Sequence, residues 1–203
     1  PYLIQIEQVG HASGREVVFG LLDFVYLKRQ PSMAAPNVTP VGQPSNNNEG
    51  RRLAKCVVWD LDNTVWTGTL AEDGKECLRL KAEVAAAMIE LDRRGILQSV
   101  ASKNDREPAL AALEAFGLKQ YLLYPEIGWG PKSNALRRIA EQLDIGLDSF
   151  VFVDDEPFVR GEVGAAHPMV TLVPSENVDR LLNDPLFDVP ATAEGSRRRG
   201  MYQ

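Results

Sequence analysis

Cysteine and histidine are scarce in this chain. The 203 residues include two cysteines, Cys56 and Cys77, and two histidines, His11 and His167. Two cysteines are too few for a disulfide framework, and no CxxC motif or Cys/His spacing of a zinc site is present. The composition therefore argues against zinc ligation and against catalysis by histidine.

Long apolar segments are also lacking. The longest apolar region, residues 17–27, is interrupted by Gly20 and Asp23, whereas a membrane helix needs about 18 or more apolar residues. The first residues lack the basic-then-apolar pattern of a secretory signal. A net charge of −6 gives no electrostatic case for binding nucleic acid or an anionic membrane. The sequence predicts a cytoplasmic protein with neither partner.

The first 50 residues differ in composition from the rest. Residues 1–30 contain two apolar runs around a Gly-His-Ala-Ser-Gly turn and predict a β-hairpin extension, which must pack on something because an isolated hairpin is marginal in water. Residues 31–50 are rich in proline and asparagine and predict a flexible linker. The remaining residues, 51–203, are predicted to form the main domain.

Short β-rich runs alternate with helical stretches in residues 51–203. The predicted strands are 56–59, 96–101, 150–153 and 170–173. The predicted helices are 82–94, 106–116, 133–143 and 157–165, and Gly95 is a candidate C-cap of the first. This alternation predicts an α/β fold with a parallel sheet and helices on both faces. Such sheets bind ligands at the carboxyl ends of their strands.

Two carboxylates follow the first predicted strand. Asp60 and Asp62 repel each other at the end of a buried strand unless a cation lies between them. A hard divalent ion such as Mg²⁺ suits carboxylate oxygens. Taken alone, such a pair is more often a loop cap than a catalytic pair.

Polar groups also follow the later predicted strands. Ser102 ends the second strand, Lys132 begins a helix, and Asp154 and Asp155 end the third strand. Each has an ordinary explanation alone: Ser102 as a helix N-cap, Lys132 as a surface lysine, and the two aspartates as caps of the next helix. Four such clusters at successive junctions indicate one phosphate- and metal-binding site.

These motifs resemble those of the haloacid dehalogenase (HAD) superfamily. The segment 60–64, DLDNT, matches its DxDxT signature, and Ser102, Lys132 and the 154–155 pair stand where its later motifs belong. Within the superfamily the chain is most similar to the FkbH-like branch. The segments that carry this likeness are KCVVWDLDNTVWTGTLAEDG, ASKND, WGPKSNALRRIAEQLDIGLDSFVFVDDEP and the terminal RRRGMYQ. The first 50 residues have no counterpart in that domain.

The resemblance implies a Rossmann-like HAD catalytic domain that uses Mg²⁺. FkbH-like proteins dephosphorylate 1,3-bisphosphoglycerate, a phosphorylated three-carbon substrate, and load a glyceryl unit on an acyl carrier protein in polyketide biosynthesis. One alternative is the magnesium-dependent phosphatase branch, whose FxDDE stretch resembles residues 152–156, acting on a small-molecule or protein phosphate. A second is a HAD module that only binds.

The resemblance also implies a role for each motif residue. Asp60 would be the nucleophile and Asp62 the general acid and base, while Ser102 and Lys132 would hold the phosphoryl oxygens. The implied substrate or phosphate contacts are Asn63, Thr64, Lys103 and Asn104. The implied metal-site residues are Asp60, Asp62, Asp154 and Asp155, with Asp62 contributing its backbone carbonyl.

The spacing of the motifs leaves no room for a cap domain. About 40 residues separate Asp62 from Ser102, and they include a predicted helix and strand, which leaves residues 65–81 for a flap. The HAD domain is therefore predicted to be capless, with Trp66 and Trp129 as candidates to line its opening or simply to pack. Of the two candidate acyl-carrying thiols, Cys77 in the flap is better placed than Cys56, which lies within a strand.

Overall fold

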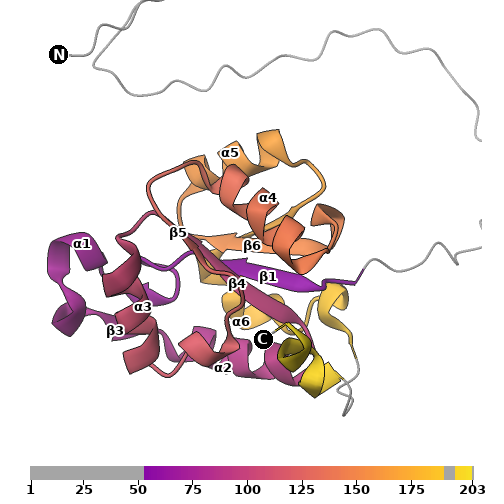
Figure 1. The fold of residues 1–203 in the computed structure, drawn as a ribbon, viewed down its shortest axis with the longest axis horizontal. Helices are drawn as coiled ribbons and strands as arrows, with labels where there is room; N and C mark the ends of the chain where they lie inside the picture. The colour runs from indigo at the N-terminus through magenta and orange to yellow at the C-terminus, as the bar shows by residue number, and fades with distance from the viewer. Residues whose placement is uncertain (1–52, 190–194, 203) are drawn as a thin grey trace, which may run out of the picture. The chain divides into compact units, whose positions relative to one another are not determined.

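A five-stranded parallel sheet forms the centre of the part of the chain that the computed structural model describes, residues 53–189 and 195–202 (Figure 1). Its strands are β1 (Cys56–Trp59), β4 (Leu97–Ser102), β5 (Glu126–Ile127), β6 (Phe150–Asp154) and β7 (Thr171–Pro174). Their spatial order is β5-β4-β1-β6-β7, and every neighbouring pair is parallel. The prediction of a parallel α/β sheet is confirmed.

Helices cover both faces of this sheet. The α-helices of the described residues are α1 (Leu70–Asp73), α2 (Ala82–Arg93), α3 (Arg106–Ala115), α4 (Lys132–Leu143), α5 (Pro157–Ala166) and α6 (Val178–Leu181). Helices α4 and α5 lie on one face, and α2 and α6 lie on the other (Figure 1). The prediction of helices on both faces is confirmed.

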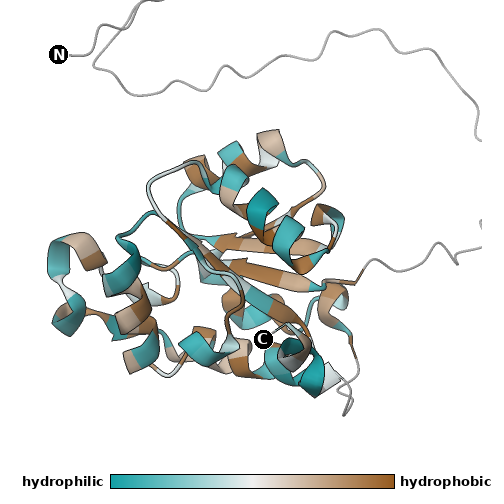
Figure 2. Ribbon diagram, in the orientation of Figure 1, coloured by the Kyte–Doolittle hydropathy of each residue, from teal (hydrophilic) through white to brown (hydrophobic). Residues whose placement is uncertain are grey.

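Alternate residues of β1 supply the two halves of the hydrophobic core. Val57 and Trp59 pack with the buried side chains of α2 and α3, whereas Cys56 and Val58 pack with those of α4 and α5. All four have no exposed surface. Successive side chains of a strand point to opposite faces, so a strand covered on both sides is apolar along most of its length. Strands β1 and β6 are accordingly mostly brown, the colour of hydrophobic residues, in Figure 2.

The register of the central strands determines where the polar residues that follow them lie. Trp59, the last residue of β1, pairs with Val100 of β4 and with Val153 of β6. Because the three strands are parallel and end at the same edge, the residues that follow them meet there. Asp60 therefore emerges beside Asp154.

Gly95 ends α2 as predicted. Its φ is 74°, the left-handed region that favours glycine. The backbone N–H of Ile96 donates to Leu91 O and that of Gly95 donates to Asp92 O, at 3.0 and 2.9 Å, which is the Schellman pattern. A Cβ on Gly95 would lie 2.6 Å from Gly195 Cα, so only glycine lets the C-terminal segment approach α2 this closely.

A buried amide joins β1, β4 and α2. The Trp59 indole N–H donates to Gln98 Oε1 at 3.1 Å, and Gln98 Nε2 donates to Met88 O at 2.7 Å. We expect Gln98→Leu to orphan both partners and to lower the free energy of unfolding by about 2–4 kcal/mol. Urea denaturation measures this loss. The exposed Gln142→Leu is the control, and equal stability of both variants would contradict the prediction.

A short flap follows the first motif. Its strands β2 (Trp66–Thr67) and β3 (Arg79–Leu80) form an antiparallel pair, with α1 between them. The flap occupies the predicted range 65–81. Between Ser102 and Lys132 the chain forms α3, a 3₁₀ turn and β5. No separate cap domain is present between Asp60 and Lys132, all of whose residues are described.

Several predictions concern residues outside the described part. The N-terminal hairpin in 1–30, the linker in 31–50 and the boundary at residue 51 all lie there, as do residues 190–194 and Gln203. Among the described residues, no helix is both long enough and apolar enough to span a membrane.

Candidate active site

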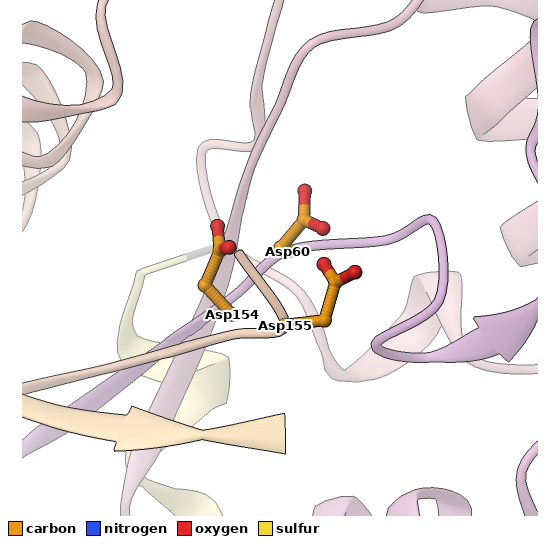
Figure 3. Close-up of side chains that lie close together, drawn as sticks. All are labelled: Asp60, Asp154 and Asp155. Atoms are coloured by element: carbon orange, nitrogen blue, oxygen red, sulfur yellow. The ribbon is translucent and has the colours of Figure 1, made fainter. Parts of the chain in front are cut away.

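Three carboxylates converge at the carboxyl ends of β1 and β6. Asp60, Asp154 and Asp155 each place one oxygen within 4.8 Å of the others (Figure 3). Asp60 is 5% exposed and Asp154 is fully buried, whereas Asp155 is partly exposed. Buried carboxylates this close repel one another, so the arrangement requires positive charge.

Lys132 supplies part of that charge. As the first residue of α4, it places its ammonium 2.5 Å from Asp60 Oδ1 and 2.7 Å from Asp154 Oδ2. It is only 5% exposed. One ammonium facing three carboxylates leaves an excess of negative charge when all are ionised, which a divalent cation could balance.

The electrostatics of the cluster follow from burial. Burial raises the pKa of Asp60 from 3.8 to about 6, with the Asp154 carboxylate adding to the rise and the Lys132 ammonium opposing it. Burial and the Asp154 charge also raise the pKa of Asp155. For Lys132, burial disfavours the ammonium, but the two carboxylates outweigh it and raise the pKa.

A second set of contacts holds the start of α4. The Glu162 carboxylate on α5 accepts from the Ser133 hydroxyl, and it accepts from the Ser133 backbone N–H at 3.3 Å. His167 Nε2 lies 2.9 Å from Ser133 O. A carboxylate at a helix N-terminus accepts hydrogen bonds from free backbone N–H groups and interacts favourably with the positive end of the helix dipole. Sequence reasoning missed Glu162, because no local motif marks a contact between two helices.

Asp62 is oriented differently from the other three acids. Its Oδ1 accepts from the Trp66 indole N–H at 2.8 Å and from Leu70 N at 3.1 Å, while its Oδ2 accepts from Asn104 Nδ2 at 3.0 Å. The sequence predicted four acidic residues around one point. The structure brings three together there, and donors from the flap and from the end of β4 hold the fourth carboxylate.

These groups open into a cavity of about 180 Å³. It is lined by Asp60, Asp62, Asn63, Thr69, Ser102, Lys103, Lys132, Asp155, Glu156 and Val159. Seven of these were predicted as site residues; Thr69, Glu156 and Val159 were not. A larger cavity of about 340 Å³ lies along β7 and contains none of the predicted residues. Chemistry rather than volume identifies the smaller one as the candidate site.

Comparison with solved structures decides the fold family. The chain is similar to the N-terminal part of the protein BF1531 from Bacteroides fragilis, which contains a phosphatase domain and was solved in complex with Mg. The two share 30% identity with a TM-score of 0.61 over 70% of this chain and 42% of that one. The chain has the HAD fold.

Two further solved structures agree with this assignment of the fold. A cobalt-bound deoxy-D-mannose-octulosonate 8-phosphate phosphatase from Haemophilus influenzae shares 17% identity over 71% of this chain and 96% of its own, with a TM-score of 0.52. A HAD-superfamily hydrolase of subfamily IA from Geobacter sulfurreducens shares 14% over 64% and 100%, with a TM-score of 0.50. No protein-family model and no curated protein matches the chain.

Two residues predicted to contact phosphate form hydrogen bonds to protein groups in this structure. Thr64 is buried and its hydroxyl donates to Asp155 Oδ1 at 3.4 Å. Asn104 is also buried and donates to Asp62 and, at 3.2 Å, to Ser102 Oγ. Neither lines the cavity. Through these hydrogen bonds, both side chains position residues that do line the cavity.

Asn63 and Lys103, by contrast, line the cavity. Asn63 adopts a φ of 52° and its Oδ1 accepts from Gly68 N at 3.2 Å, so it shapes the loop that leads into the flap. Its carbonyl accepts from the Lys81 ammonium. Lys103 is exposed at the end of β4, where its charge can attract an anionic ligand.

The two cysteines differ in environment. Cys56 lies within β1 with no exposed surface, and burial raises the pKa of its thiol. A buried thiol of this kind behaves as a small hydrophobe. Cys77 is exposed, at the end of a 3₁₀ turn in the flap. Neither lines the cavity.

The two tryptophans considered for the opening also differ. Trp66 is fully buried and its ring lies 5.9 Å from that of Phe116, so it packs within the domain. Trp129 is 65% exposed, and its indole N–H donates to Asp105 Oδ1 at 3.1 Å. Of the two tryptophans, Trp129 is therefore the one that is exposed enough to contact a ligand outside the cavity.

Proposed function

We propose that the chain is a Mg²⁺-dependent phosphoryl-transfer enzyme of the HAD type, with Asp60 as its nucleophile. The observation that carries the proposal is the buried group of Asp60, Asp154, Asp155 and Lys132 at the carboxyl ends of parallel strands. The similar Bacteroides protein, described as containing a phosphatase domain and complexed with Mg, supports it.

The donor set fits Mg²⁺. The ion prefers oxygen ligands and commonly takes one or two carboxylates together with phosphate oxygens. The oxygens of Asp154 already accept from Lys132 and, at 2.8 Å, from the backbone N–H of Glu156. Asp60 and Asp155 would therefore hold the ion, together with the backbone carbonyl of Asp62. The bound ion would neutralise charge on the phosphoryl group.

The residues of the chain divide the chemistry between them. A carboxylate oxygen of Asp60 attacks phosphorus and forms an aspartyl-phosphate as the bond to the leaving oxygen breaks. Asp62 gives that oxygen a proton and later takes one from the water that hydrolyses the aspartyl-phosphate. Ser102 and Lys132 hold the phosphoryl oxygens.

For the substrate, we propose the FkbH-like reaction. Asp60 would remove the 3-phosphate of 1,3-bisphosphoglycerate, leaving an alcohol at C3. The thiol of an acyl carrier protein would attack the C1 carbonyl, so that the C–S bond of a glyceryl thioester forms as the bond to the 1-phosphate breaks and phosphate departs. The motifs of residues 55–74, 101–105 and 129–157 support this branch. The absence of a cap domain between Asp60 and Lys132 also supports it, because a flap of residues 65–81 is all that the chain places between the first motif and α2. A carrier protein could reach such a site.

Phosphate hydrolysis without acyl transfer is the second candidate. The burial of Cys56 favours it, since that thiol cannot reach a ligand without opening the core. A module that only binds is the least favoured, because each catalytic position carries the residue type that the reaction needs.

One experiment separates the candidates. The protein is incubated with 1,3-bisphosphoglycerate, Mg²⁺ and a phosphopantetheinylated acyl carrier protein, and phosphate release and intact masses are measured. A glyceryl adduct on the carrier protein supports the FkbH-like reaction, and peptide mapping with Cys77→Ser tests whether that thiol carries the unit first. Phosphate release without an adduct selects the phosphatase. An absence of phosphate release from this and other phosphate esters would contradict both.

We expect Mg²⁺ to stabilise the protein at neutral pH. A ligand that binds only the native state at 100 times its dissociation constant adds about 2.7 kcal/mol to the free energy of unfolding. This corresponds to roughly 5–10 °C in Tm for a domain of this size. Thermal melts with and without Mg²⁺ measure the shift. A buffer without divalent metal ions and with chelator gives the baseline Tm. An unchanged Tm on addition of Mg²⁺ would contradict the metal site.

The Mg²⁺ shift should disappear in acid. Because the pKa of Asp60 is about 6, its proton competes with the metal below that pH, and apparent affinity falls roughly tenfold per unit. In the absence of metal, the free energy of unfolding should instead increase as the pH falls. A raised carboxyl pKa contributes stability that is present below about 4 and lost as pH rises through about 6. Melts from pH 4.5 to 7.5 test both trends.

A further inference from the structure

The hydrogen bonds of Asp62 distinguish its two oxygens. Each carboxylate oxygen offers about two lone-pair positions. Oδ1 accepts from both Trp66 Nε1 and Leu70 N, so both of its positions are used. Oδ2 accepts from Asn104 Nδ2 and keeps one position. Because Asp62 lines the cavity, Oδ2 is the oxygen that can exchange a proton with a ligand there.

Asn104 connects Asp62 to Ser102. Its side chain is buried, and its amide nitrogen donates to Asp62 Oδ2 at 3.0 Å and to Ser102 Oγ at 3.2 Å. The two amide hydrogens serve these two acceptors. Ser102 Oγ therefore acts as an acceptor toward Asn104, and its own hydrogen is left to donate to an anionic ligand in the cavity.

Trp66 fixes the other side of Asp62. Its ring is fully buried and packs against Phe116, so the indole N–H has little freedom to turn away. Leu70 N, the second donor to Oδ1, belongs to the first residue of α1. The flap therefore holds Oδ1 while Asn104 directs Oδ2.

We infer that Asn104 and Trp66 are positioning residues that make Asp62 Oδ2 the proton-transferring atom. The inference rests on the proposed function. When the bond between phosphorus and the leaving oxygen breaks, the proton on Asp62 Oδ2 moves to that oxygen and an alcohol departs. Water then attacks the phosphorus of the aspartyl-phosphate and gives its proton to Oδ2, and the bond to Asp60 breaks. Proton and charge are restored after each turnover.

The role of Asp62 as the proton donor can be tested with two substrates whose leaving groups differ in their need for a proton. Glycerol 3-phosphate releases an alkoxide unless it is protonated, whereas 4-nitrophenyl phosphate releases a stable phenolate. For Asn104→Leu we expect kcat/KM to fall about 100-fold or more with glycerol 3-phosphate, within the usual range for general acid catalysis. With 4-nitrophenyl phosphate the loss should be about tenfold at most, since only Ser102 is then disturbed.

The ratio of the two losses isolates the effect on Asp62. Weaker phosphate binding through Ser102 lowers kcat/KM equally for both substrates, because kcat/KM reports the steps up to formation of the aspartyl-phosphate. Gln98→Leu is the matched control: like Asn104, Gln98 is a buried amide that is 1% exposed, but it faces the core. It should lower stability and leave the ratio unchanged.

Trp66→Phe gives a second and independent test. It keeps an aromatic ring and removes one donor to Oδ1, so its losses should also be larger with glycerol 3-phosphate. It serves as the test if Asn104→Leu does not fold. Equal losses with both substrates for the folded variants would overturn the positioning role while leaving the proposed function intact. If the unaltered protein released phosphate from neither of these substrates nor from 1,3-bisphosphoglycerate, the proposed function would fail and this assignment with it.

Discussion

Asp60→Asn is expected to lower the rate of phosphate release by a factor on the order of 10⁴ or more. The amide has the shape of the carboxylate but lacks the charge needed to attack phosphorus. Its carbonyl oxygen can still accept from Lys132, which also keeps its contact of 2.7 Å to Asp154. The fold should therefore survive the substitution, and the loss should be one of chemistry.

Phosphate release and a thermal melt together measure this result. Asp144→Asn is a matched control, because it makes the same chemical change at the C-cap of α4, where a φ of 52° suits asparagine. It should leave activity unchanged. Turnover by a well-folded Asp60→Asn protein within tenfold of the unaltered enzyme would rule out an aspartyl-phosphate.

The positions of the site residues along the fold could be predicted because they depend on strand ends. An apolar run such as Cys56–Trp59 marks a strand covered on both faces, and the structure places β1 at those bounds. Parallel strands end at one edge of the sheet, so Asp60 and Asp154 were expected at the same edge, and the pairing of β1 with β6 in the structure brings them together. The fold class followed from the same alternation of strands and helices.

The direction of individual side chains could not be predicted in the same way. Asp62 was placed with the other acids, but its carboxylate is held by Trp66, Leu70 and Asn104, and that choice depends on how the flap folds. A flap with strands of two residues leaves no periodic pattern to interpret. Strand β5 also has two residues and was not predicted for the same reason.

Lys132→Met tests the positive charge that faces the carboxylates of the site. Methionine keeps much of the length of the side chain and removes the ammonium that contacts Asp60 and Asp154. Activity should fall by about 10²–10³, the usual loss for one group that stabilises developing charge. Stability without metal at pH 7 should fall by about 3–5 kcal/mol, because buried carboxylates lose their counter-charge.

Two conditions should reverse much of this loss of stability. Without the ammonium, which lowers the pKa of Asp60, the Asp60 carboxyl holds its proton more tightly, so the variant gains stability relative to the unaltered protein as pH falls from 7 to 5. Mg²⁺ should also restore stability, because it supplies positive charge to the carboxylate cluster through Asp60 and Asp155, but it should not restore activity in full. Lys119→Met, which removes a lysine paired with Glu114 at the surface, should change neither property. If Lys132→Met were as stable as the unaltered protein at pH 7 without metal, the three carboxylates would not be ionised together, and the electrostatic case for a divalent cation would fail.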